Sequence, residues 1–295
     1  MSRSGQPSPS TEDPQRPGKT DLQPYWNRVS ETYAADDPLG AVCYPGAPTW
    51  LNRFIAGLQW HTVTRVLETQ QLRGTRALDI GCGFGRWTRW LGEHGAEVIG
   101  IDSTEGMLEA ARRVSTGKVD FQKMSATALE FPDNHFDLVT CITVIQHLKP
   151  AEQDVAIGEL CRVIRPGGRA VVLDLVDLSD KGKIVYPRPG SDWMSAYTAH
   201  GMQMETWHGQ EFVPLIRAFR WLAEAASGLL GVGTTAEQEG PSLLEQTSGR
   251  GVFKIAYGGL WFIVQVSKPL EFVCQRLLPR HWARHACFVF QKEAS

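Results

Sequence analysis

The sequence predicts an α/β protein built on a doubly wound, mainly parallel sheet of seven strands with a helical insert. Short apolar runs of strand length alternate with helix-compatible segments between residues 76 and 209. Residues 210–283 then separate this alternation from a closing strand, and they are too many for a connecting loop. With 42% hydrophobic residues the chain can bury a substantial core.

Five segments are expected along the chain. Residues 1–22 are rich in Ser, Pro, Gly and charge, which predicts a disordered tail. Residues 23–75 form an N-terminal helical cap, whose longer helix opens at Thr49 and ends near Gly74. A ligand-binding α/β core covers 76–209, a helical substrate cap covers 210–283, and 284–295 hold the last core strand and a tail.

The core elements are predicted from apolar runs, helical spacing and the turn residues between them. The expected strands are 77–80, 97–102, 119–123, 136–143, 169–175, 202–207 and 286–291. The expected helices are 86–93, 105–114, 151–163 and 192–200.

Composition excludes some classes of function. The net charge of −2 gives no electrostatic drive toward nucleic acid, so no nucleic-acid partner is expected. The six cysteines stand singly, without a Cys-x-x-Cys pair, which is typical of reduced, buried thiols. No signal-like apolar segment opens the sequence, and we therefore expect a cytoplasmic protein.

The glycines that follow the first predicted strand indicate a ligand-binding turn. Gly81, Gly83 and Gly85 are spaced by two, and a helix-compatible segment follows them. Glycines allow positive φ and let a ligand approach the backbone, and the helix start adds unpaired N–H groups. The spacing is one residue short of the dinucleotide fingerprint, and Asp79 precedes the first glycine by two positions. A carboxylate there favours a ligand that carries an ammonium group over a bare anion.

A second acid ends the next predicted strand. Asp102 lies about 20 residues beyond the first glycine, where a carboxylate can accept hydrogen bonds from both hydroxyls of a ribose. The alternative is a helix N-cap or a solvated turn.

Together with two later motifs, this stretch resembles the class I methyltransferases that use S-adenosylmethionine (SAM). The motifs are the Asp-x-Gly-x-Gly-x-Gly loop at 79–85, the entry to a strand at 131–139, and Arg-Val-Ile-Arg-Pro-Gly-Gly at 162–168. The resemblance covers about residues 76–175 and implies SAM as the cofactor. It implies that the cofactor is bound by Asp79, Gly81, Cys82, Gly83, Gly85, Asp102, Ser103, Met107, Ser125, Ala126 and Cys141. Ser125 departs from the family pattern, which often has an acid there to meet the adenine.

The residues after the fourth strand bear on the mechanism. The sequence lacks the Asn/Asp-Pro-Pro-aromatic segment that methylases of planar amide or adenine nitrogens carry after this strand. It also has Cys141 where metal-dependent methylases need an acid, so the resemblance favours a reaction without a metal. His147 is the candidate general base, because its unperturbed pKa suits proton transfer near neutrality. The alternative is a histidine that braces the next helix. His200 and His208 are weaker candidates.

Two aromatic or apolar regions outside the core are expected to meet over the pocket. Tyr25, Trp26, Tyr33 and Tyr44 either close over the ligands or pack between cap and core. In the insert a helix is expected near Pro214, and the apolar run 255–266 is too short for a bilayer span. We expect this run, with Trp261 or Phe262 near the pocket, to roof the site with residues 25–44. Residues 250–285 are basic, and the alternative is that they contact an anionic membrane peripherally.

These features predict a SAM-dependent methyltransferase that acts on a small, apolar or aromatic acceptor. The sequence resembles methylases of quinone and secondary-metabolite pathways. Oxygen is the first expectation for the methylated atom, and carbon or nitrogen come next. One alternative is a SAM-binding regulatory or scaffolding protein without transfer activity. Another is a peripheral membrane methyltransferase with a lipidic acceptor.

Overall fold

The computed structural model describes residues 22–33, 43, 49–68, 70–117, 119–178, 184–211, 273, 277 and 282–294 of the chain. Most of the predicted tail 1–22 and of the predicted cap 210–283 therefore lies outside the described residues. The same holds for Tyr44, for Trp261 and Phe262, for the helix expected near Pro214 and for most of the basic stretch 250–285. The side chain of Tyr33 is likewise not described.

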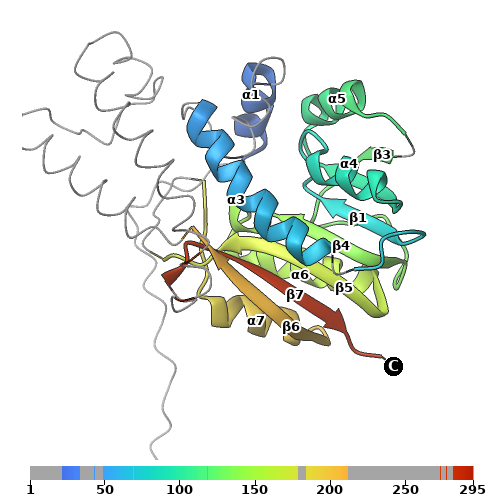
Figure 1. Cartoon of the computed structure of the whole chain (residues 1–295), viewed down its shortest axis with the longest axis vertical. Helices are drawn as coiled ribbons and strands as arrows, with labels where there is room; N and C mark the ends of the chain where they lie inside the picture. Colours follow the sequence, from blue (N-terminus) through green and yellow to red (C-terminus); the bar gives the residue numbers. More distant parts are fainter. Residues whose placement is uncertain are drawn as a thin grey trace, which may run out of the picture.

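One seven-stranded sheet organises the described residues, and it confirms the predicted fold class (Figure 1). Its strands are β1 (Arg76–Ile80), β2 (Glu97–Asp102), β3 (Val119–Lys123), β4 (Phe136–Ile142), β5 (Ile164–Leu175), β6 (Met202–Gln210) and β7 (His285–Lys292). The order across the sheet is β3-β2-β1-β4-β5-β7-β6, with β1 to β5 parallel and β7 antiparallel to both of its neighbours. The carboxyl ends of the parallel strands thus share one edge of the sheet, which is called the carboxyl edge below. The opposite edge is called the amino edge.

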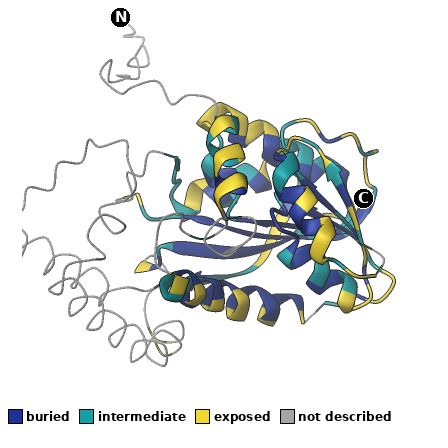
Figure 2. Ribbon diagram, turned by 90° about the horizontal axis from the view of Figure 1, so that it is seen from above, coloured by how far each residue is buried: buried dark blue, intermediate teal, exposed yellow. Residues whose placement is uncertain are grey.

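Helices cover both faces of this sheet (Figure 2). They are α1 (Gln23–Tyr33), α3 (Thr49–Leu67), α4 (Arg86–Glu93), α5 (Glu105–Val114), α6 (Pro150–Val163) and α7 (Gly190–Thr198), with a 3-10 turn η1 (Ile145–His147). Apolar residues of α3 and α4 form one cluster with alternate strand residues such as Leu138 and Val289. Residues of α6 and α7 pack with the other strand face, where Trp193 and Phe288 are buried. The sheet is therefore buried between two helical layers, as in a doubly wound fold. None of the described helices has the length and apolar character that a membrane crossing needs.

Two strand boundaries differ from the predicted ones by three residues or more, for reasons of pairing, while the other strand boundaries agree to within one residue. The strand β5 begins at Ile164 rather than at Arg169, because Ile164 already pairs with Phe136 before an irregularity in the register. At Gly168 a Cβ would lie 2.9 Å from the carbonyl oxygen of Arg165, so only glycine fits there. The strand β6 extends to Gln210 because it stays paired with β7 as far as His285.

Helix α1 packs beside α5 at the carboxyl edge. Val29, Tyr25 and Trp26 form a cluster with Phe84 and Met107. The approach to α5 is close, since a Cβ at Gly106 would lie 2.6 Å from the hydroxyl of Ser30. The predicted short helix between residues 21 and 48 is therefore present, and it covers the ends of the strands.

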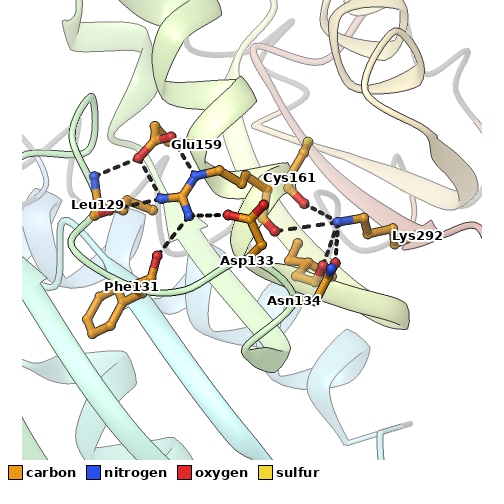
Figure 3. A network of polar contacts seen from close by, with 9 residues as sticks. Leu129, Phe131, Asp133, Asn134, Glu159, Cys161 and Lys292 are labelled. Carbon is orange, nitrogen blue, oxygen red and sulfur yellow. Dashed lines mark hydrogen bonds and ion pairs between the residues drawn. The ribbon is translucent and has the colours of Figure 1, made fainter.

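A dense polar network holds the amino edge (Figure 3). Arg162 in α6 uses all five guanidinium N–H groups within it. Its acceptors, at 2.8 to 2.9 Å, are both carboxylate oxygens of Glu159, one of Asp133, and the carbonyl oxygens of Leu129 and Phe131. The arginine thereby fixes the loop that leads into β4.

The ammonium of Lys292 at the end of β7 completes this network. It donates to the carbonyl oxygens of Cys161 and Ile164 at 2.9 and 2.7 Å, and to the side chain of Asn134 at 2.9 Å. A positive charge at the C-terminus of α6 also interacts favourably with the helix dipole. Lys292 thus joins the end of β7 to the end of α6 and the start of β5.

Candidate functional site

The glycine turn between β1 and α4 adopts backbone conformations that other residues resist. Gly81, Gly83 and Gly85 have φ values of 65°, 53° and 69°. A Cβ at Gly81 would lie 2.3 Å from a methyl carbon of Val144, in the segment that follows β4. The three glycines therefore allow the turn to pass close to the end of the neighbouring strand.

Asp102 joins this turn to the end of β2. Its two carboxylate oxygens accept the backbone N–H groups of Gly83 at 3.0 Å and of Thr104 at 2.8 Å. Burial raises the pKa of this carboxyl group. Each oxygen retains a further acceptor position, because an ionised carboxylate offers about four lone-pair sites.

A cavity of about 370 Å³ opens at the carboxyl edge beside these residues. Its walls come from the ends of β1, β2, β3 and β4, from α1, and from the segment before α7. Nine of the residues named from the sequence line it: Trp26, Gly81, Gly83, Asp102, Ser103, Met107, Ser125, Ala126 and His147. This is the edge at which open α/β sheets bind their ligands.

Asp79, Cys82, Gly85 and Cys141 were also expected at the cofactor, but they do not line this cavity. Asp79 is buried in the sheet, where Thr88 and Thr140 donate hydrogen bonds to its two oxygens at 2.7 and 2.8 Å. Burial raises its pKa to about 6, although these bonds act against the increase. Gly85 caps α4, while Cys82 and Cys141 are buried thiols whose pKa burial raises. These four residues stand behind the cavity wall.

At Ser125 the cavity wall carries hydroxyl groups where the family often has a carboxylate. The hydroxyl oxygens of Ser125 and Thr127 lie 2.8 Å apart, and both residues line the cavity. Hydroxyls both donate and accept, so this end of the cavity can still hydrogen-bond a polar ring edge.

His147 also lines the cavity, from η1. Its Nδ1 is 2.7 Å from the carbonyl oxygen of Ile184. A carbonyl can only accept, so in the neutral ring the proton is on Nδ1 and Nε2 is the acceptor nitrogen. The side-chain nitrogen of Gln146 lies 3.4 Å from this Nε2. The indole ring of Trp26 meets the imidazole edge to face, with ring centroids 5.0 Å apart. His200 and His208 do not line the cavity.

Several lining residues were missed from the sequence. Thr143 directly follows β4 and has a φ of 59°, which is unusual for a β-branched residue. Tyr186 comes from a proline-rich segment that signals only a loop. The other lining residues that were not predicted are Leu22, Gln23, Thr104, Met124, Thr127, Ile142, Val144, Leu148, Lys149 and Glu152. Their positions depend on how distant segments pack, for which no local sequence signal exists.

The residues present fit SAM. The glycine turn gives close backbone approach, Asp102 offers acceptors for a ribose, and the cavity volume lies within the usual range for small ligands. Among the described residues, no group of three His, Cys, Asp or Glu is placed to hold a metal ion.

Comparison with known proteins supports the same reading. Residues 78–172 match the methyltransferase domain family. Over 162 residues the chain is 32% identical to the ubiquinone/menaquinone biosynthesis C-methyltransferase UbiE of Pseudomonas entomophila, covering 52% of this chain and 58% of that protein. The chain thus spans less than two thirds of the length of this curated relative.

Solved structures share the fold at lower identity. The [4+2]-cyclase SpnF has a TM-score of 0.54 and 20% identity, with 93% of both chains covered. The magnesium protoporphyrin IX methyltransferase ChlM of Synechocystis, solved with S-adenosylhomocysteine, has a TM-score of 0.51 and 19% identity, with 63% of this chain and 90% of that chain covered. The chain carries a class I SAM-dependent methyltransferase domain, homologous to small-molecule methyltransferases of the UbiE type.

Proposed function

We propose that this protein transfers the methyl group of SAM to a small, apolar or aromatic acceptor bound beside His147. The observation that carries the proposal is that groups suited to the cofactor and a group suited to proton transfer line the same cavity. Asp102 and the glycine turn line it, and so does a histidine with a fixed proton position.

The cofactor end is assigned to the residues that line the cavity near the glycine turn. Gly81 and Gly83 let the backbone approach the ligand, Asp102 accepts the ribose hydroxyls, and Ser125 and Ala126 meet the adenine. Ser103 and Met107 complete the wall. When bound, SAM supplies an electrophilic methyl group on a sulfonium. Asp79, Cys82, Gly85 and Cys141 support this wall from behind.

His147 is assigned the role of general base. The bond to Ile184 fixes the proton on Nδ1, so Nε2 is the nitrogen that takes a proton from the acceptor. For displacement at a methyl carbon, the main task of the protein is to align the nucleophile of the acceptor with that carbon. A base within the same wall serves this by removing the proton of the attacking group as it forms its bond to carbon.

The acceptor is expected to be largely apolar, with an ionisable hydroxyl or an activated ring carbon. Trp26, Leu148 and Tyr186 contribute apolar surface near His147. The relative UbiE is named for C-methylation in quinone biosynthesis, which is chemistry at an activated aromatic carbon. A phenol or hydroquinone suits both oxygen and carbon methylation, because loss of the hydroxyl proton activates both atoms.

Transfer of an isotope-labelled methyl group tests the proposal. The protein is incubated with methyl-deuterated SAM and with a catechol, a hydroquinone or a naphthohydroquinone, and the products are read by mass spectrometry. We expect a labelled product with at least one of these compounds. In the His147→Ala variant the rate should fall on the order of 10²- to 10⁴-fold while the affinity for SAM is kept.

His200→Ala is the matched control, since His200 lies outside the cavity, and its rate should equal that of the wild type. Transfer at the wild-type rate by His147→Ala would return this histidine to a bracing role. If S-adenosylhomocysteine binds but no acceptor in a wide panel is methylated, the binding protein without transfer activity becomes the better interpretation. The shared fold with a cyclase shows that such a scaffold is not tied to one reaction.

A further inference from the structure

The turn that carries His147 is held from beneath by two buried polar side chains. The Nε2 of Gln153 in α6 donates to the carbonyl oxygen of Ile145 at 3.1 Å. The Oδ1 of Asp174 in β5 accepts the backbone N–H of Gln146 at 3.1 Å. Both side chains have no exposed surface. One side chain thus supplies a donor and the other an acceptor to the same peptide group of η1, the one that joins Ile145 to Gln146.

Gln153 also joins this turn to the segment at Tyr186, which lines the same cavity. The same Nε2 donates to the carbonyl oxygen of Tyr186 at 2.9 Å. The backbone N–H of Tyr186 in turn donates to the carbonyl oxygen of Gln146 at 2.6 Å. Ile184, which fixes the proton of His147, lies two residues earlier in the same segment. The position of that carbonyl relative to the imidazole therefore depends on the bonds made by Gln153.

This arrangement includes buried polar atoms that reduce the stability of the folded protein. Such atoms are not expected in a part of the fold that serves stability alone. Asp174 Oδ2 and Gln153 Oε1 are buried and have no hydrogen-bond partner among the described residues. Burial raises the pKa of Asp174 well above its ordinary value. Each unsatisfied buried polar group costs about 1–3 kcal/mol, which apolar residues of similar size would avoid. Thr143, two residues before η1, adds a strained backbone. Such costs concentrate where a site must keep a set geometry.

We propose that Gln153 and Asp174 are positioning residues for His147. They hold the backbone of η1 and the segment at Ile184 in one relative position, so that the imidazole keeps a single tautomer. The inference rests on the proposed role of His147 as the base, because a base needs its acceptor nitrogen turned to the substrate and its other nitrogen protonated.

The tautomer of His147 can be read without knowing the acceptor. The full chain is labelled with ¹⁵N-histidine, and the ring resonances of His147 are identified by their loss in His147→Ala. At a pH where the ring is neutral, the wild type should show one protonated and one unprotonated nitrogen. Gln153→Met keeps the volume and removes the donor, and both ring resonances should move toward their average.

Asp174 is tested with a disruptive and a conservative change. Asp174→Val removes the acceptor and should give the same averaged resonances as Gln153→Met. Asp174→Asn keeps an acceptor oxygen for Gln146, so the single tautomer should return. The matched control is Gln203→Met, which removes a hydrogen bond to Glu293 at the amino edge and should leave His147 unchanged.

Calorimetry with S-adenosylhomocysteine separates this inference from the proposed function. The affinity should stay within about threefold in all four variants, because the cofactor end of the cavity is untouched. If Gln153→Met keeps the wild-type tautomer, the positioning role is overturned even where stability falls. Should Asp174→Val fail to fold, Gln153→Met and Asp174→Asn still decide the question. Failure of the wild type to bind S-adenosylhomocysteine would overturn the proposed function and leave the tautomer result to stand by itself.

Discussion

The two edges of the sheet treat their polar groups in opposite ways. At the amino edge, the guanidinium of Arg162 and the ammonium of Lys292 meet carboxylates and carbonyl oxygens throughout (Figure 3). At the carboxyl edge, buried side-chain atoms remain without a hydrogen-bond partner in Gln146, Gln153, Asp174 and Gln210. Within the described part of the chain, three residues other than glycine have positive φ. Thr143 and Glu211 directly follow strands at the carboxyl edge, whereas the third, at the amino edge, is Asn134, a residue type that tolerates this conformation.

The difference indicates a division of labour within one fold. Satisfied networks stabilise the folded state, whereas strain and unpaired polar atoms reduce its stability and persist where a ligand or a reaction needs them. The ion pair between Glu211 and Arg284, which lies at the carboxyl edge, follows this pattern. Burial alone would raise the pKa of Glu211, but His285 and Arg284 lower it to about 2, and they do so next to the unpaired side chain of Gln210. Changes at the amino edge should therefore affect stability, and changes at the carboxyl edge should affect binding.

The largest effect on binding is expected from Gly83→Val. A β-branched residue resists the φ of 53° and adds bulk to the cavity wall. Calorimetry should detect no binding of SAM. Gly74→Val is the matched control, because Gly74 has a φ of 75° with open space around it. It should lose similar stability and bind SAM normally. Normal binding by a folded Gly83→Val variant would show that this turn is not the site.

At the amino edge, Arg162→Met should lower the free energy of unfolding by about 2–4 kcal/mol. It removes the donor to the carbonyl oxygens of Leu129 and Phe131, and it leaves the Glu159 carboxylate with only the backbone N–H of Leu129 as a donor among the described residues. Chemical denaturation measures the loss. The affinity for S-adenosylhomocysteine should be unchanged. Arg169→Met, which removes a half-exposed pair with Glu205, should cost below about 1 kcal/mol. Equal losses in the two variants would show that the Arg162 network stabilises the fold no more than the Arg169–Glu205 pair does.

Asp102→Ala should weaken SAM binding at least tenfold without unfolding the protein, which corresponds to about 1.4 kcal/mol or more. The reason is the loss of charge-assisted hydrogen bonds to the ribose, partly offset by rehydration. Asp137→Ala is the paired change at the amino edge, where this carboxylate accepts the backbone N–H of Arg76 at 2.8 Å. It should reduce stability and spare binding. An unchanged affinity in Asp102→Ala would remove Asp102 from the site.

The smallest effect is expected from Thr143→Gly. Glycine adopts the left-handed conformation without steric cost, so the free energy of unfolding should rise by up to about 1 kcal/mol. Thermal unfolding with and without S-adenosylhomocysteine provides the measurement. A clear loss of stability in the free protein would mean that Thr143 is not strained, and the contrast between the edges would be weaker.

The sequence was most informative where structure is decided locally. The bounds of β2, α4, α5 and β3 agree with the predicted ones, because apolar periodicity and turn residues mark them. The glycine turn and Asp102 were found because the residue type itself carries the conformational or chemical requirement. Trp26 was expected either to close over the ligands or to pack between cap and core, and it lines the cavity. Thr143 and Tyr186 became part of the cavity wall only through packing between distant segments. The placement of Asp79 in the interior, bonded to Thr88 and Thr140, likewise depends on two other elements.

A crystal structure with S-adenosylhomocysteine tests the central claim most directly. We expect the ribose hydroxyls within hydrogen-bond distance of the Asp102 carboxylate, and the sulfur directed toward the end of the cavity that holds His147 and Tyr186. A ligand bound elsewhere, or a sulfur directed away from His147, would contradict the account of the carboxyl edge as the site of methyl transfer.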